Sequence, residues 1–251
     1  MTVSDQSDID ALKRIGRIVA EARDAMGAAV VPGITTAELD ELGERVLARY
    51  GARSAPRLAY GFPGATCISV NDRLAHGIPS RDSVLCDGDL VNIDVSAELD
   101  GYWADTGASF AVGSVKPRDR ALLWATRKAL HEGMDRARAG RPVREIGRAV
   151  EQRAKRSGFQ VVRDLCGHGV GRHIHEEPSI PNVAKDADDT ALWEGLVMTI
   201  EPFLTTSANR VVEDADGWTL RTPDRSRGAQ FEHTLIVTRG APVVLTLGAP
   251  T

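Results

Sequence analysis

The chain has 251 residues, of which 42% are hydrophobic, enough for one large buried core or two small ones. Its 31 Lys and Arg residues against 35 Asp and Glu residues give a net charge of −4, so neither a polyanion partner nor nucleic acid is indicated as the main ligand. No window approaches 18 uninterrupted apolar residues and residues 1–10 are polar and acidic, so we expect neither a membrane span nor a signal peptide.

Two helices are predicted at the start of the chain. Residues 7–30 repeat apolar side chains with the period of an amphipathic helix, which Pro32 and Gly33 stop. Thr35 and Glu38 form a capping box for a second helix, which closes at Gly51. We assign the apolar faces of both helices to core packing.

Residues 56–79 have Gly and Pro between short β-prone runs, of which residues 66–70 are the clearest. We therefore expect short strands in this segment. His76 follows, beside Gly77, in a predicted loop. A single His in a loop is usually a surface group, and only its closeness in sequence to the next motif favours a function.

Residues 92–106, NIDVSAELDGYWADT, predict a β-hairpin in which Asp100-Gly101 is a two-residue turn. This turn places Asp94 and Asp105 on one face as diagonal neighbours, roughly 7 Å apart or less at Cβ. A four-residue loop would place them directly opposite each other. Two carboxylates on one face repel unless they are solvated or a cation lies between them. The hairpin alone leaves both alternatives open.

Two further helices are predicted after the hairpin. The first begins at residues 115–117 and ends at Gly140, and the second runs from residues 141–142 to Ser157-Gly158. The order of two helices and strands, followed by two helices and strands again, indicates a duplicated half of roughly 110 residues. The two halves share no evident residue identity, so this inference rests on element order.

Residues 165–178, LCGHGVGRHIHEEP, contain His168, His173 and His175 among several Gly residues. In an extended chain His173 and His175 would share a face and His168 would point elsewhere, but the Gly residues weaken this rule. His residues at this density indicate a metal or catalytic site more often than packing. We expect one of the three to be a bystander.

Two carboxylates lie in apolar strand contexts, Glu201 in LVMTIEPFL and Glu232 in AQFEHTLIVT. Burying either one unpaired would be costly, and exposure at a sheet edge, which Pro202 permits for the first, is the alternative. Added to two Asp residues and a His, the two Glu residues complete a ligand set for a pair of divalent cations. Such a pair activates water for hydrolysis.

Six of these motifs together carry a resemblance to a known family. They are HGIP from His76, NIDV around Asp94, DGYWADT to Thr106, GHGVGRHIHEEP from Gly167, TIEP around Glu201 and FEHT around Glu232. Over essentially its whole length the chain resembles the type I methionine aminopeptidases of the pita-bread fold. The resemblance implies an α+β fold with a pseudo-symmetric antiparallel β-sheet core flanked by two pairs of helices. It also implies a single catalytic metallopeptidase domain over residues 1–251, with a short polar lead at 1–6.

The resemblance also assigns a metal site. It implies that Asp105 and Glu232 bridge two divalent metal ions, that Asp94 completes one ion, and that His168 with Glu201 completes the other. Cobalt, manganese, iron, zinc and nickel all suit such a carboxylate-rich site, and the sequence leaves the identity open.

The resemblance further implies three residues that act on the substrate. His175 would stabilise the intermediate at the scissile carbonyl, His76 would contact the substrate backbone, and Glu201 would be the general base for the attacking water. The apolar walls of a methionine pocket would be Phe62, Cys67, Ile174 and Trp218. Ala59 stands where many members have a bulky aromatic residue and Ala104 where a Gly is common, which leaves the width of the pocket open.

The function implied is removal of the initiator Met from nascent proteins whose second residue is small, by attack of a metal-activated water on the first peptide bond. An aminopeptidase or dipeptidase of the same fold with proline or other specificity is one alternative, and a non-catalytic peptide-binding module is another. The partner expected is the N-terminal peptide of a nascent protein, with a ribosome contact left open. We expect a monomer without nucleic-acid or membrane partners. The odd number of Cys residues, without CxxC spacing, is typical of a reducing cytoplasm.

Overall fold

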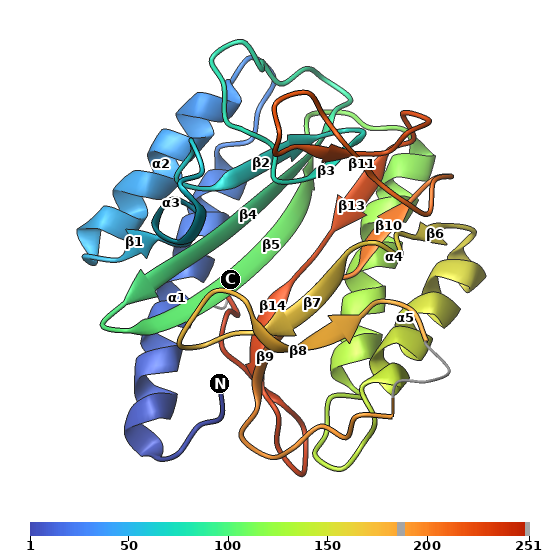
Figure 1. Ribbon diagram of the computed structural model, residues 1–251. Helices are drawn as coiled ribbons and strands as arrows, with labels where there is room; N and C mark the ends of the chain where they lie inside the picture. Colours follow the sequence, from blue (N-terminus) through green and yellow to red (C-terminus); the bar gives the residue numbers. More distant parts are fainter. Residues whose placement is uncertain (185–188, 249–251) are drawn as a thin grey trace.

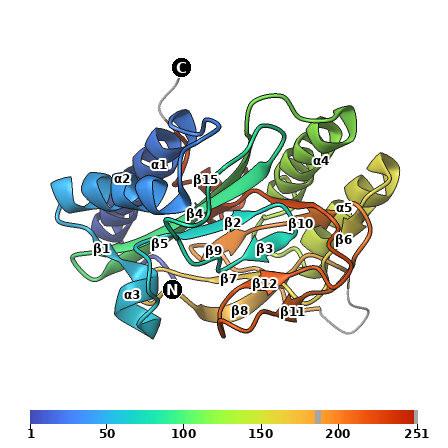
Figure 2. The ribbon, with the colours of Figure 1, turned by 90° about the horizontal axis from the view of Figure 1, so that it is seen from above.

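The structure is a computed structural model that describes residues 1–184 and 189–248. Its helices are α1 (Gln6–Ala28), α2 (Thr36–Arg49), α3 (Ala55–Tyr60), α4 (Pro117–Met134) and α5 (Arg144–Ser157). Figure 1 shows α1 and α2 at the left of the molecule and α4 and α5 at the right, and the two pairs are again apart in the view from above in Figure 2. No described helix combines the length and the apolar character needed to cross a membrane.

The described strands form four sheets, and the named strands pair antiparallel throughout. One sheet contains β1 (Arg53–Ser54), β2 (Cys67–Val70), β4 (Leu90–Leu99) and β5 (Tyr102–Ala111). Another contains β7 (Cys166–Gly169), β8 (Glu176–Pro181), β9 (Val197–Ile200), β14 (His233–Ile236) and β15 (Val243–Val244). The two smaller sheets contain β6 (Gln160–Val161), β10 (Phe203–Thr205) and β13 (Gly228–Gln230), and β3 (Arg73–Ala75), β11 (Val212–Glu213) and β12 (Leu220–Arg221).

Each helix pair covers its own apolar cluster. On α1, Ile15 and Val19 are fully buried in one cluster with Ile93 of β4. Near the other pair, Ile146 of α5 is fully buried in a second cluster with Leu235 of β14. This arrangement confirms the predicted α+β class, with an antiparallel core flanked by two pairs of helices.

The predicted hairpin is confirmed to the residue. Leu99 pairs with Tyr102 and Asp94 with Gly107, so the turn has two residues and the two Asp side chains share a face. Both turn residues have positive φ, +53° at Asp100 and +81° at Gly101. A turn of this type demands that conformation at both positions, and Asp-Gly is a favoured pair for it.

Short strands are present in residues 56–79, as expected, but the segment begins with the helix α3, which was not predicted. Ser54 caps this helix because its side chain accepts a hydrogen bond from the Arg57 amide, and Pro56 lies in its first turn. Gly61 ends it in the left-handed region, with φ of +70°. The residues that cap α3 could be recognised in the sequence, but a helix of six residues is too short to show a periodic pattern of apolar side chains.

The third helix, α4, was predicted to end at Gly140, but in the structure it ends earlier, at Met134. The amides of Arg136 and Ala137 then make turn bonds to the carbonyls of Gly133 and Met134. The Ala139 amide donates to Thr238 and the Gly140 amide to Leu192. The chain therefore leaves the helix through local turns and is held at residues 139–140 by distant carbonyls.

Hydrogen bonds made by residues within β5 join the two halves of the chain. The Asp105 amide donates to Oγ1 of Thr234 at 3.0 Å, and the same hydroxyl donates to the Asp105 carbonyl at 2.7 Å. The Glu232 amide donates to the carbonyl of Gly107 at 2.8 Å. This seam fixes the backbone of the second half against the acidic face of the hairpin.

Candidate metal centre

The five predicted metal ligands come from five separate places and meet at the seam between the halves. Asp94 and Asp105 lie on β4 and β5, His168 on β7, Glu201 directly after β9, and Glu232 between β13 and β14. Asp105, His168 and Glu232 each offer a ligand atom within 4.8 Å of one another. Nε2 of His168 lies 3.8 Å from Oδ2 of Asp105 and 3.4 Å from Oε1 of Glu201. The Asp94 carboxyl contacts that of Asp105.

Burial makes this cluster costly for charged groups. It raises the pKa of Asp94, Glu201 and Glu232 well above the usual range, and the charge of Asp105 raises all three further. Burial also raises the pKa of Asp105 to about 6 and lowers that of His168 to about 3. Bound protons or a cation must therefore neutralise the negative charge of the carboxylates. Without a metal ion the neutral, protonated forms are favoured, and a bound divalent ion would favour the ionised forms instead.

Two buried oxygen atoms in the cluster have no hydrogen-bond partner among the described residues. They are Oδ1 of Asp105 and Oε1 of Glu232, the two side chains expected to bridge the metals. Leaving such an acceptor unsatisfied costs about 1–3 kcal/mol each. Oxygen and imidazole nitrogen donors in this number suit hard to borderline divalent ions, so the residues present fit a metal site.

Neighbouring polar groups orient the ligands. Nδ1 of His168 lies 2.9 Å from the Gly169 carbonyl, which can only accept, so Nδ1 carries the proton and Nε2 is left free to bind a metal. Oγ1 of Thr199 accepts from the His168 amide at 3.0 Å and donates to Oε1 of Glu201 at 3.1 Å. Nε2 of Gln230 donates to Oε2 of Glu232 at 3.0 Å. The contacts of Thr199 and Gln230 with the ligands were not predicted from the sequence. The signal that could have indicated them is that each is a polar residue two positions before a candidate Glu.

A cavity of about 670 Å³ opens beside the cluster, and we call it the main cavity. Among its lining residues are Phe62, Cys67, His76, Asp94, Asp105, His168, Ile174, His175, Glu201 and Trp218. The structure thus brings the predicted residues together. Glu232 does not line the cavity but is buried next to Asp105 and His168. Phe62 meets Trp218 edge to face, with ring centroids 5.2 Å apart. Tyr60 also lines the cavity, and no motif in the sequence predicts this.

The three His residues of the Gly-rich segment do not follow the extended-chain rule. Residues 171–175 are bent rather than extended, so His175 turns back to His168, with ring centroids 4.3 Å apart and planes at 69°. His173 is exposed and does not line the main cavity. His76 lines the main cavity and has φ of +53°, a conformation uncommon outside Gly.

Smaller spaces lie outside the main cavity, and two of them are close to α3. A side hollow of about 410 Å³ shares Tyr60, Ile174 and His175 with it and includes Ala59 in its wall. Ala104 is fully buried in the core. Neither alanine therefore lines the main cavity, and both departures from the family pattern lie outside its walls.

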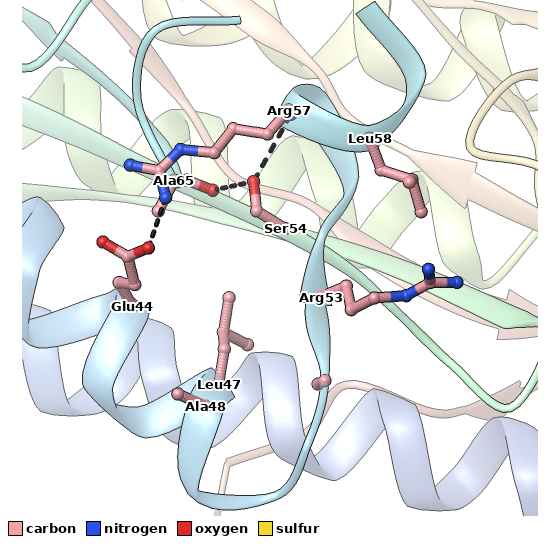
Figure 3. Close-up of a pocket in the computed structure, with 9 residues that line it drawn as sticks. Glu44, Leu47, Ala48, Arg53, Ser54, Arg57, Leu58 and Ala65 are labelled. Atoms are coloured by element: carbon pink, nitrogen blue, oxygen red, sulfur yellow. Dashed lines mark hydrogen bonds and ion pairs between the residues drawn. The ribbon is translucent and has the colours of Figure 1, made fainter. Parts of the chain in front are cut away.

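The second space is a groove of about 350 Å³ between α2 and α3 (Figure 3). An ion pair between Arg57 and Glu44 crosses it, and Ser54 donates to the Ala65 carbonyl at 2.7 Å. None of the predicted site residues lines this groove. The buried carboxylates around His168 and the predicted substrate-binding residues lie at the main cavity, so we place the candidate site there.

Comparison with known proteins identifies the family of the chain. The sequence pattern described as Metallopeptidase family M24 matches residues 10–239. The chain is 47% identical to methionine aminopeptidase 2 of Bacillus subtilis, covering 98% of this chain and 99% of that one. The crystal structures of methionine aminopeptidase from Rickettsia prowazekii and Thermotoga maritima superpose with TM-scores of 0.93 and 0.94, at 36% and 33% identity. Both superpositions cover 98% of this chain. They cover 100% of the Rickettsia prowazekii chain and 99% of the Thermotoga maritima chain. The chain therefore belongs to metallopeptidase family M24, and its fold is the pita-bread fold of these relatives.

Proposed function

We propose that the protein is a metal-dependent aminopeptidase that removes an N-terminal Met from chains whose second residue is small. The observation that carries the proposal is the convergence of four carboxylates and a His at a cavity that also has apolar walls. Three of the carboxylates and the His line this cavity, and Glu232 is buried behind the lining. Membership of a metallopeptidase family and near-full-length similarity to a methionine aminopeptidase support it.

The metal site would hold two divalent ions. Four ionised carboxylates bring a charge of −4, which two divalent ions balance and one does not. Asp105 and Glu232, whose unpartnered oxygens face the cluster, would contact both ions, Asp94 one, and His168 with Glu201 the other. When bound, such ions supply Lewis acidity toward a carbonyl and lower the pKa of water.

The protein's own groups have separate tasks in this proposal. Glu201 would accept the proton of the attacking water, since its carboxyl lines the main cavity and hydrogen-bonds to Thr199. His175 would donate to the carbonyl oxygen of the first peptide bond, where negative charge develops during attack. His76, on the same cavity, would hold the substrate backbone.

The methionine side chain would lie against Phe62, Cys67, Ile174 and Trp218. Two of these are aromatic and one is a thiol, neighbours that suit a polarisable thioether. Burial and the nearby carboxylates raise the pKa of the Cys67 thiol, so this side chain is neutral and acts as an apolar wall. The substrate would be the N-terminal peptide of a newly made protein, bound by a monomer in the cytoplasm, with a ribosome contact as a further possibility to test.

The test is peptide hydrolysis by purified protein loaded separately with manganese, iron, cobalt, zinc or nickel. We expect Met release from Met-Ala-Ser, little release from Met-Leu-Ser, and none from Leu-Ala-Ser. Failure to release Met with every metal would contradict the proposal. Preferential cleavage of an Xaa-Pro dipeptide would instead favour a proline-specific enzyme of the same fold.

A further inference from the structure

Tyr60 is the last residue of α3 and reaches the main cavity from outside the metal cluster. The helix ends there because Gly61 takes the left-handed conformation, and the Gly61 amide donates back to the Arg57 carbonyl at 3.0 Å. The chain therefore turns between Tyr60 and Phe62. Phe62 is buried against Trp218, whereas Tyr60 is 51% exposed at the rim that the main cavity shares with the side hollow.

The hydroxyl of Tyr60 forms a hydrogen bond with Nδ1 of His175. The two rings lie 5.6 Å apart at their centroids and are tilted by 39°. On its other side the His175 ring meets His168 at 4.3 Å. Among the described residues, Tyr60 is the hydrogen-bond partner of the His175 ring, so it fixes the direction of that ring.

This hydrogen bond also decides which nitrogen of His175 carries the proton. In its neutral form an imidazole has one N–H and one bare nitrogen. A phenol is a good donor and the bare imidazole nitrogen is a better acceptor than a phenol oxygen, so the favoured arrangement has Tyr60 donating to Nδ1. The proton of the ring then lies on Nε2.

We propose that Tyr60 is a positioning residue that holds His175 as the Nε2–H tautomer, so that Nε2–H can donate to the carbonyl oxygen of the scissile bond. The inference rests on the proposed function, because it assumes that His175 acts on that carbonyl. It adds a residue from α3, outside the metal cluster and the methionine pocket, to the groups that set the rate.

The test is Tyr60→Phe, which removes only the hydroxyl. On Met-Ala-Ser we expect kcat to fall about five- to tenfold, the effect of losing one hydrogen bond of ordinary strength, with KM changed less than about twofold. Tyr50→Phe is the matched control, because that hydroxyl donates to Glu21 at 2.7 Å, away from both cavities. The control should keep wild-type kcat.

Two further measurements separate positioning from a general structural role. In a His175→Ala background, Tyr60→Phe should cause no additional loss, since its partner is absent. In zinc-loaded, ¹⁵N-labelled protein, His175 should show Nε2 protonated and Nδ1 bare, and Tyr60→Phe should populate the other tautomer. The His175 signals are identified by their absence in His175→Ala.

An unchanged kcat in Tyr60→Phe, an equal loss in the His175→Ala background, or a His175 ring protonated on Nδ1 in the wild type would each overturn the inference. Failure of the proposed function is distinguishable, because the wild type would then release no Met, while the NMR measurement would still report on the Tyr60–His175 pair.

Discussion

Asp105 is the residue on which the electrostatics of the site depend. Its charge raises the pKa of Asp94, Glu201 and Glu232, and its Oδ1 is buried without a hydrogen-bond partner among the described residues. In the absence of a metal ion its charge disfavours the ionised forms of the neighbouring carboxyls, whereas we propose that it contacts both ions when they are bound. The same group should therefore oppose folding and favour metal binding.

Asp105→Asn separates these two effects. Removing the charge while keeping the shape should reduce Met release more than about 100-fold, since even loss of an outer-shell partner costs 10- to 100-fold. Metal content by elemental analysis should fall, while the thermal midpoint of the metal-free protein should rise by a few degrees because like-charge repulsion is relieved. Asp82→Asn, an exposed Asp elsewhere, should change neither quantity. A variant that keeps both metal and turnover would show that Asp105 is not a ligand.

At the scale of elements, the hairpin of β4 and β5 sets the geometry of the acidic pair. Its register was predictable because turn chemistry and strand alternation are local properties. The meeting of His168 with His175 was not, since it depends on the bent path of residues 171–175. The hydrogen bond from the His168 amide to Thr199 could not be predicted either, because it joins two strands that are 31 positions apart in the chain.

Gly101→Ala tests the hairpin turn. Gly101 has φ of +81°, and a left-handed backbone costs a residue with a Cβ about 1–2 kcal/mol. We expect the free energy of unfolding in urea to fall by about that amount. Asp100→Asn is the control, because Asn tolerates the φ of +53° at that position and the ion pair lost, with Arg14 at 3.3 Å, is exposed. Equal stability of Gly101→Ala and the wild type would contradict this account of the turn.

Asp8, in α1, connects this helix to the hairpin of β4 and β5 and to residues 165–178. Oδ1 of Asp8 accepts from Tyr102 at 2.8 Å and from Arg172 at 2.9 Å. Hydrogen bonds from Ser4, with smaller contributions from Tyr102 and Arg172, lower the pKa of Asp8 to about 2. Because the folded protein binds this proton more weakly, the stabilisation is present above the ordinary pKa of 3.8 and is lost as pH falls toward 2.

Asp8→Asn should consequently be less stable than the wild type at pH 7. Its free energy of unfolding should also fall less steeply between pH 4 and pH 2.5, since the residue that titrates there is gone. Urea unfolding at a series of pH values measures both. Parallel curves for the two proteins over this range would mean that Asp8 does not contribute to the acid sensitivity.

At the scale of the whole molecule, the five proposed metal ligands are divided between the halves. Asp94 and Asp105 come from the first sheet with α1 and α2, and His168, Glu201 and Glu232 from the part that includes α4 and α5. Backbone bonds such as that from Glu232 to Gly107 bring these like charges together. The antiparallel, two-fold-like architecture could be predicted from element order and the family motifs, but the seam itself could not, because it joins residues over a hundred positions apart.

The most direct measurement is a titration of metal-free protein with a divalent ion, with bound metal and Met release followed in the same samples. We predict no turnover without metal, activity that rises with metal content, and saturation at about two ions per chain. Full activity in protein shown by elemental analysis to contain no transition metal would contradict the claim that divalent ions balance the buried carboxylates.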